Sequence, residues 1–113
     1  MTNTSTLLHL VNINGIPCTE SSSVSTTTTN VVYSFNPSPI RYPNFSGLIA
    51  VKITTAAPAA SDALPVQFTT TGVSNSTIAL TTFAGAAVTS ANLAAGIHLV
   101  FFDRAAGVLQ LIA

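Results

Sequence analysis

The residue types that could perform acid–base or nucleophilic chemistry are few in this sequence. They are two histidines, one cysteine and three acidic residues, namely His9, His98, Cys18, Glu20, Asp62 and Asp103. Nucleophilic catalysis needs a nucleophile, a base within hydrogen-bond reach and a group that orients the base. His98 lies in a predicted strand and Asp103 five residues beyond it in the following turn, so the two are not expected to touch, and no Gly-x-Ser-x-Gly elbow is present. The sequence therefore predicts a protein that is not an enzyme and has no catalytic residues.

The same residues do not have the spacing of a metal or cofactor site. Zinc sites use closely spaced cysteine and histidine pairs, whereas His9, Cys18 and His98 are scattered along the chain. Both histidines alternate with apolar neighbours, which favours a core or subunit contact over a metal ligand. No glycine-rich phosphate loop is present. We therefore expect no metal and no cofactor.

Charge is scarce in this chain of 113 residues, since only 5% are charged and the formal net charge is zero. Nucleic-acid binding needs clustered lysine and arginine, so no nucleic-acid partner is expected. Neither a polybasic anchor nor an apolar run long enough to span a bilayer is present, so no membrane partner is expected. The first residues do not resemble a signal peptide, so synthesis and folding in a cytosol are expected.

Apolar and β-branched runs predict an all-β fold. The predicted strands are residues 5–14, 31–35, 46–55, 64–71, 77–83, 97–102 and 108–112. The serine- and threonine-rich residues 19–30 suit either an edge strand or a loop. Residues 84–96 contain at most one short helical turn, near 90–95, because no segment sustains helical periodicity.

These elements predict a single β-domain over residues 1–113, with residues 1–30 as a candidate extended N-terminal arm. An antiparallel β-sandwich and a small barrel both fit, and a jelly-roll-like topology is included among them. Several strands are β-prone and nearly uncharged, so exposed edges would aggregate. The fold is therefore expected to hide its edges by closure, by sheet packing or by docking on neighbours.

The strand at residues 97–102 is apolar on both of its faces. Ile97, Leu99 and Phe101 share one face, and the other carries His98, Val100 and Phe102. A sheet with one face in solvent shows a stricter alternation of apolar and polar residues, so both faces of this strand are expected to be covered. One cover is the core, and the other is a loop or a neighbouring subunit.

Six residues are candidate interface residues. Three are aromatic and lie in or near the proline-rich loop at residues 36–43, and three share one face of the strand at residues 97–102. Aromatic side chains are typical of interface cores. They are Tyr33, Tyr42, Phe45, His98, Val100 and Phe102.

The second half of the chain, about residues 64–113, resembles the closing segment of small tailed-bacteriophage virion proteins. In these proteins a short polar turn leads into an apolar strand, an Asp-containing turn and a terminal strand. The matching positions are Val88, Thr89, Ala91, Asn92, Leu93, Gly96, 99–103 and 107–112. The last strand departs from the pattern, because Leu109 stands where an aromatic residue is usual. The resemblance implies a structural protein of the virion, of the capsid cement, decoration or fibre type.

This resemblance agrees with the low charge and with the lack of a predicted active site. The expected function is that of an auxiliary capsid protein located in the virion and assembled in the host cytoplasm. Its expected partners are further copies of itself, most simply as a trimer, and a major capsid or other virion protein. The alternative is a cell-surface or fibre adhesion module that binds glycans through loop aromatics.

Overall fold

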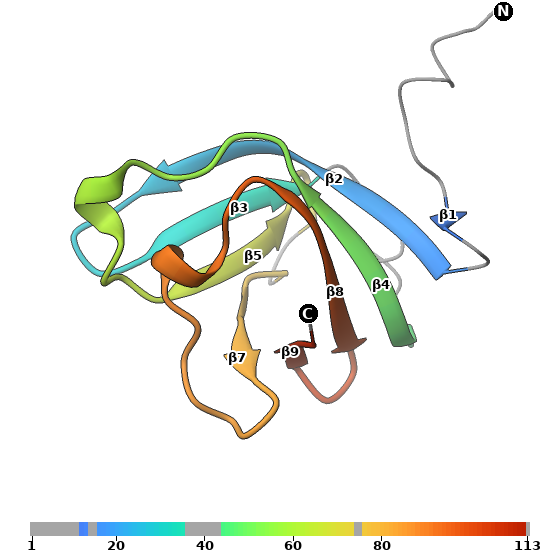
Figure 1. Ribbon diagram of the computed structural model, residues 1–113. Coiled ribbons are helices and arrows are strands. Elements are labelled where there is room, and N and C mark those ends of the chain that lie inside the picture. Colours follow the sequence, from blue (N-terminus) through green and yellow to red (C-terminus); the bar gives the residue numbers. More distant parts are fainter. Residues whose placement is uncertain (1–11, 14–15, 36–43, 74–75, 113) are drawn as a thin grey trace, which may run out of the picture.

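The computed structural model describes residues 12–13, 16–35, 44–73 and 76–112. This part of the chain is built almost entirely of strands (Figure 1). The elements are β1 (Asn12–Ile13), β2 (Ile16–Thr26), β3 (Val31–Phe35), β4 (Ser46–Ile53), η2 (Ala59–Ser61), β5 (Val66–Thr70), β6 (Ile78–Ala79), β7 (Thr81–Thr82), η3 (Ser90–Asn92), β8 (Gly96–Asp103) and β9 (Val108–Leu111). The predicted all-β class is confirmed.

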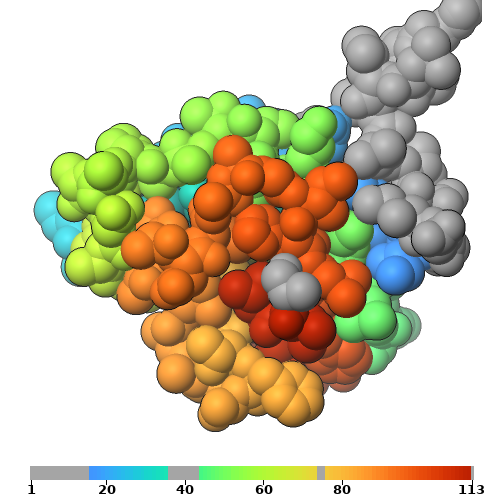
Figure 2. Space-filling view, in the orientation of Figure 1, coloured from blue at the N-terminus to red at the C-terminus, as the bar shows by residue number. Residues whose placement is uncertain are grey.

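The strands form one sheet that curls into a nearly closed barrel. The strand order is β6-β5-β3-β2-β4-β8-β9-β7, with β1 paired to β2 outside this path. The two end strands, β6 and β7, are separated in sequence only by Leu80, so the chain itself bridges the two ends of the sheet. Figure 2 shows the red C-terminal segment at the surface near the yellow-orange segment that contains β7, with which β9 pairs. This curvature limits the exposed sheet edges.

The sheet is mixed, which the sequence pattern did not predict. β2 pairs in parallel with β4, β3 with β5, and β7 with β9, while the other pairings are antiparallel. Alternation of apolar and polar residues defines the two faces of a strand, but it does not indicate which strands lie beside it or in which direction they run. The predicted antiparallel pairing is therefore corrected to a mixed one, while the nearly closed sheet has the barrel-like form that was among the predicted alternatives.

The serine- and threonine-rich segment forms a long strand rather than a loop. β2 lies between β3 and β4, and its register on β3 shifts between Ser21 and Ser23. Residues 16–26 of the predicted N-terminal arm therefore belong to the barrel. Most of the predicted strand at residues 5–14 lies outside the described residues, apart from β1. The proline-rich loop at residues 36–43 also lies outside them.

Two short 3-10 turns occur in the described residues. η3 is the helical turn expected near residues 90–95, and the Thr89 hydroxyl donates to Asn92 Oδ1 at 3.0 Å across it. η2 was not predicted, because it lies in the small-residue connection at residues 56–63, which has no helical pattern. Gly96, which follows η3, has a φ of 130°. This is a backbone conformation that glycine adopts more readily than other residues.

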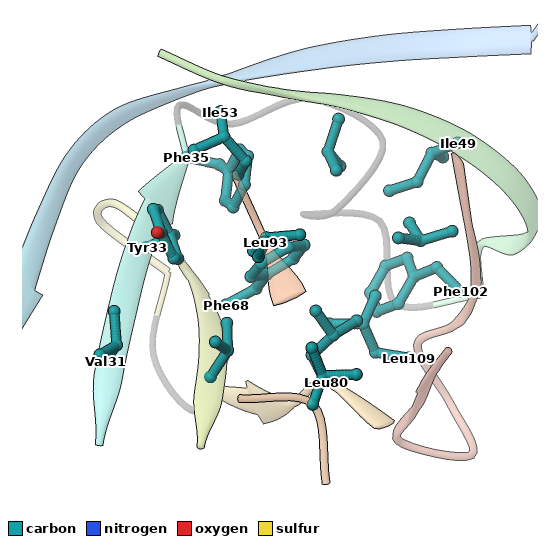
Figure 3. Close-up of a cluster of buried hydrophobic side chains, with 14 residues drawn as sticks. Val31, Tyr33, Phe35, Ile49, Ile53, Phe68, Leu80, Leu93, Phe102 and Leu109 are labelled. Carbon is teal, nitrogen blue, oxygen red and sulfur yellow. The ribbon is translucent and has the colours of Figure 1, made fainter. Parts of the chain in front are cut away.

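The barrel interior is filled by the inward side chains of the strands (Figure 3). β3 alternates buried and half-buried residues, so Val31, Tyr33 and Phe35 all point inward. Phe68 on β5 contacts two of them, with ring centroids 4.7 Å from Phe35 and 6.2 Å from Tyr33. Leu80 also has no exposed surface, so the residue that links β6 to β7 anchors that link in the core.

Ser76 closes the end of β5 through side-chain hydrogen bonds. Its hydroxyl accepts from the Thr70 backbone N–H at 3.0 Å and lies 2.8 Å from the Val73 carbonyl oxygen, to which it donates. Ser76 is 2% exposed. Because the site is buried, water does not readily replace a lost partner.

Replacing Ser76 with alanine should therefore destabilise the fold. Ser76→Ala leaves the buried Thr70 N–H without its acceptor, and we expect a loss of about 1–3 kcal/mol in the free energy of unfolding. Urea denaturation followed by circular dichroism measures the loss. Thr77→Ala is the control, because Thr77 is exposed and its removal should cost less than about 0.5 kcal/mol. Equal costs for both variants would contradict the assigned role of Ser76.

Candidate functional site: an outward apolar sheet face

β4, β8 and β9 carry apolar side chains on the outside of the barrel as well as on the inside. Directly opposed residues of an antiparallel pair point to the same side, and Leu48 is opposed to Phe101. Ile112 belongs to the same side, because its N–H donates to the Leu99 carbonyl at 2.8 Å and continues the β8–β9 ladder. We call this surface the outer apolar face, and its exposed or half-buried apolar members are Leu48, Ile97, Leu99, Phe101 and Ile112. The same side also carries Ala50, which is 4% exposed and opposed to Leu99, and the half-buried Gln110, which is opposed to Phe101.

The outer apolar face is open to solvent at its margins. Leu48 is 41% exposed, Ile97 52% and Ile112 43%. Leu99 and Phe101 lie between them in the ladders and are half-buried. Isolated exposed apolar residues are ordinary on protein surfaces, whereas contiguous ones mark interaction sites.

The opposite face of β8 turns toward the core, which corrects the prediction for Val100 and Phe102, whereas His98 on that face is half-buried. Val100 is 0% exposed and Phe102 is 1% exposed, so neither side chain is available to a partner. His98 lies on the same side of the strand, and its Nε2 is 2.7 Å from the Ala94 carbonyl oxygen. The pattern separated the two faces of β8 correctly, but alternation by itself does not say which face is inward.

The two described aromatic candidates near the proline-rich loop, Tyr33 and Phe45, are engaged within the chain. Tyr33 is completely buried, and its Oη accepts a hydrogen bond from the Ala57 N–H at 3.2 Å. Phe45 is half-buried and stacks on Phe102, with ring centroids 5.9 Å apart. Tyr42 lies outside the described residues. Among the described residues, Tyr33 is therefore corrected from a recognition residue to a core residue.

Charged residues border the outer apolar face at both ends of β8. At one end Lys52 is opposed to Ile97, points outward, and lies 3.8 Å from Glu20 Oε1. At the other end is Asp103, whose Oδ1 accepts from the Ala106 N–H at 3.1 Å in the β8–β9 turn. The Lys52 side chain is 42% exposed, so its ion pair with Glu20 contributes little to stability.

The residues able to do chemistry are dispersed in the described part of the barrel. Cys18 is buried at 4% exposure and opposed to Ala50 on β4, while Asp62 is exposed beside η2. His9 lies outside the described residues. In the described ranges, no group of three or more His, Cys, Asp or Glu side chains is placed to hold a metal ion. The outer apolar face is therefore the candidate site.

Cys18 should react slowly with electrophiles in the folded protein. Burial raises the pKa of its thiol, the nearby Glu20 carboxylate raises it further, and Lys52 opposes both effects. Since the thiolate is the reactive form, we expect alkylation by iodoacetamide at pH 8 to be at least about tenfold slower than in the urea-unfolded chain. Similar rates in the two states would contradict this environment.

The raised pKa of Cys18 also predicts a dependence of stability on pH. The unfolded thiol ionises at a lower pH than the folded thiol, so the unfolded state releases its proton first. The free energy of unfolding should therefore fall as the pH rises above about 8.5. Denaturation midpoints between about pH 8 and pH 9.5 measure the fall, and Cys18→Ala should remove this contribution.

Two members of the outer apolar face, Leu48 and Ile112, were not singled out from the sequence. Their positions follow from the registers of β4 and β9 on β8, which are tertiary information. The remaining members were recognised as one face of β8 but were not chosen as the interface. A signal was present, because Ile97, Leu99 and Phe101 are followed by Asp103 on the same side.

Comparisons of the whole chain with protein-family models, with curated proteins and with solved structures give no match. Within the described residues, the structure contains no helix with the length and apolar character needed to cross a bilayer.

Proposed function

We propose that this chain is a non-enzymatic structural protein of a tailed-phage virion, of the cement or decoration type that stabilises the capsid shell through subunit contacts. Its partners are further copies of itself and a major capsid or other virion protein. The observation that supports the proposal most directly is the outer apolar face, which presents Leu48, Ile97 and Ile112 to solvent.

The charge content supports the same role. A nearly uncharged surface gives little electrostatic protection against association, and a net charge of zero gives no long-range repulsion between copies. Such a surface suits a protein that is packed against neighbours in an assembly. The barrel also limits its sheet edges, so association is directed to a face rather than to edge-to-edge strand addition.

The test is whether the chain is present in purified particles. Particles from the organism that encodes the chain are purified by density gradient, and the chain is quantified by mass spectrometry against the most abundant coat protein. We expect a fixed ratio between preparations that persists through a high-salt wash, because apolar contacts are not screened by salt. Absence from the particles, or a ratio that varies with washing, would overturn the virion role.

A glycan-binding adhesion module is the competing outcome of a second measurement. Of the three aromatic residues that would contact sugar, Tyr33 and Phe45 are engaged inside the chain and Tyr42 lies outside the described residues. We expect no shift of the melting temperature on a panel of glycans. A saturable shift with one glycan class would favour the adhesion module.

A further inference from the structure

We propose that two copies of this chain pair through their outer apolar faces about a two-fold axis, with β8 of one copy antiparallel to β8 of the other. The inference deepens the proposed structural role and rests on it for the assembly in which the pair is used. A two-fold contact uses the same patch on both copies, so that patch must be complementary to itself. The arrangement of apolar and charged residues along β8 meets this requirement.

Charge complementarity selects the antiparallel arrangement. Lys52 borders one end of the outer apolar face, with its partner Glu20 one strand further from β8, and Asp103 borders the other end. If β8 of the second copy ran in the same direction, Asp103 would face Asp103, and both Lys52 side chains would lie at the same end of the pair. The antiparallel arrangement instead places Lys52 of each copy near Asp103 of the other. Like charges brought together at an interface are costly, so the parallel arrangement is disfavoured.

The apolar residues of the two copies also lie against one another in the antiparallel arrangement. Ile97 lies at the Lys52 end of the face, whereas Leu48 and Phe101 lie opposite each other toward the Asp103 end. Reversing one copy therefore brings Ile97 of each copy to the Leu48 and Phe101 end of the other. Leu99 and Ile112 share a level near the middle of β8 and lie closer to the axis. Apolar side chains thus meet apolar side chains along β4 and β8, while the polar Gln110 lies on the β9 margin of the face, opposed to Phe101.

The small area of the outer apolar face limits the affinity of the pair. Between Ile97 and Asp103, β8 covers about 20 Å, and the width across β4, β8 and β9 is about 10 Å before side chains are added. The face thus offers roughly 200 Å² per copy before side chains are added and about 300 Å² with them, against about 800 Å² per partner in a stable interface. We therefore expect a weak, reversible dimer rather than an obligate one. In a many-copy assembly, multivalency would strengthen such a contact.

Sedimentation velocity of the full chain from about 10 µM to about 1 mM tests the pair. We expect a monomer–dimer equilibrium, and the double variant L48T/I97T should raise the dissociation constant at least about tenfold by removing buried apolar area. Threonine keeps a high strand propensity, so the variant should fold. F83T is the control for loss of an exposed apolar side chain, because Phe83 is 77% exposed and lies in the turn after β7 rather than on β4, β8 or β9, and it should change the dissociation constant much less than L48T/I97T.

A charge-reversal cycle tests the direction of the two strands. K52E and D103K should each weaken the dimer about threefold at low salt, and the combined variant should return to within about twofold of the parent. Circular dichroism of each variant confirms that it folds, which matters because Asp103 also accepts a turn hydrogen bond. No recovery in the combined variant would overturn the antiparallel arrangement.

The outcomes separate this inference from the proposed function. A chain that stays monomeric at the highest concentration, forms a trimer, or forms a dimer insensitive to L48T/I97T would overturn the two-fold pair. Each of those results leaves the particle experiment to decide the virion role. Conversely, sedimentation could show the expected dimer while the chain is absent from purified particles. That combination would support the two-fold pair and overturn the virion role.

Discussion

Val100→Asp should abolish folding, whereas Ile97→Asp three residues away should leave a folded barrel. Val100 has no exposed surface and lies among apolar side chains in the core, while Ile97 is 52% exposed on the opposite face of the same strand. An ionised carboxylate in the core has no charge partner there, and we expect a cost of at least about 4 kcal/mol. At Ile97 the cost is limited to the poor strand propensity of aspartate, about 1 kcal/mol.

The measurement for this pair is the folded fraction by circular dichroism and the denaturation midpoint in urea. Val100→Asp should show little native signal at neutral pH. Ile97→Asp should show a native spectrum together with weaker self-association in sedimentation, since it places a charge in the outer apolar face. A folded Val100→Asp variant beside an unfolded Ile97→Asp variant would mean that the inward and outward faces of β8 are reversed.

Phe68→Ala should be among the most destabilising truncations in the barrel. Phe68 is 2% exposed, and its ring contacts Phe35 and Tyr33. Truncation removes the buried ring and leaves a cavity that the strands, tied by their hydrogen bonds, do not readily fill. We expect a loss of about 3–5 kcal/mol in the free energy of unfolding. This is a large share of the stability of a typical small domain.

Phe83→Ala is the matched control for Phe68→Ala, because it deletes the same ring from a position that is 77% exposed. Its cost should stay within about 0.5 kcal/mol. Urea denaturation with an unchanged slope for both variants would attribute the difference to the folded core. A small loss for Phe68→Ala, similar to that for Phe83→Ala, would show that the aromatic cluster does not hold the barrel together.

Strong local patterns were sufficient to predict most of the described strands. β3 coincides with the predicted strand at residues 31–35, and β8 and β9 lie close to the predicted hairpin strands. The helical turn near residues 90–95 was also found, as η3. These elements depend on short-range properties, namely β-branched or aromatic content, alternation and turn residues.

Only part of the candidate site could be predicted from the sequence. The division of β8 into two faces was correct, because it follows from strand alternation. The choice of Val100 and Phe102 as interface residues was wrong, because both faces of β8 are apolar and nothing local distinguishes them. Tyr33 was misassigned for a related reason, since its hydroxyl finds a backbone partner at Ala57 that is distant in sequence.

The sequence by itself determined the all-β class, most strand positions, and the shortage of charge that makes association the central question for this protein. Only the tertiary structure decided which strands are neighbours, that three pairings are parallel, and which face of β8 turns inward. The physical reason is that alternation and propensity act over a few residues. Strand order and sidedness depend instead on packing between segments far apart in the chain, such as Ile49 on β4 and Val100 on β8.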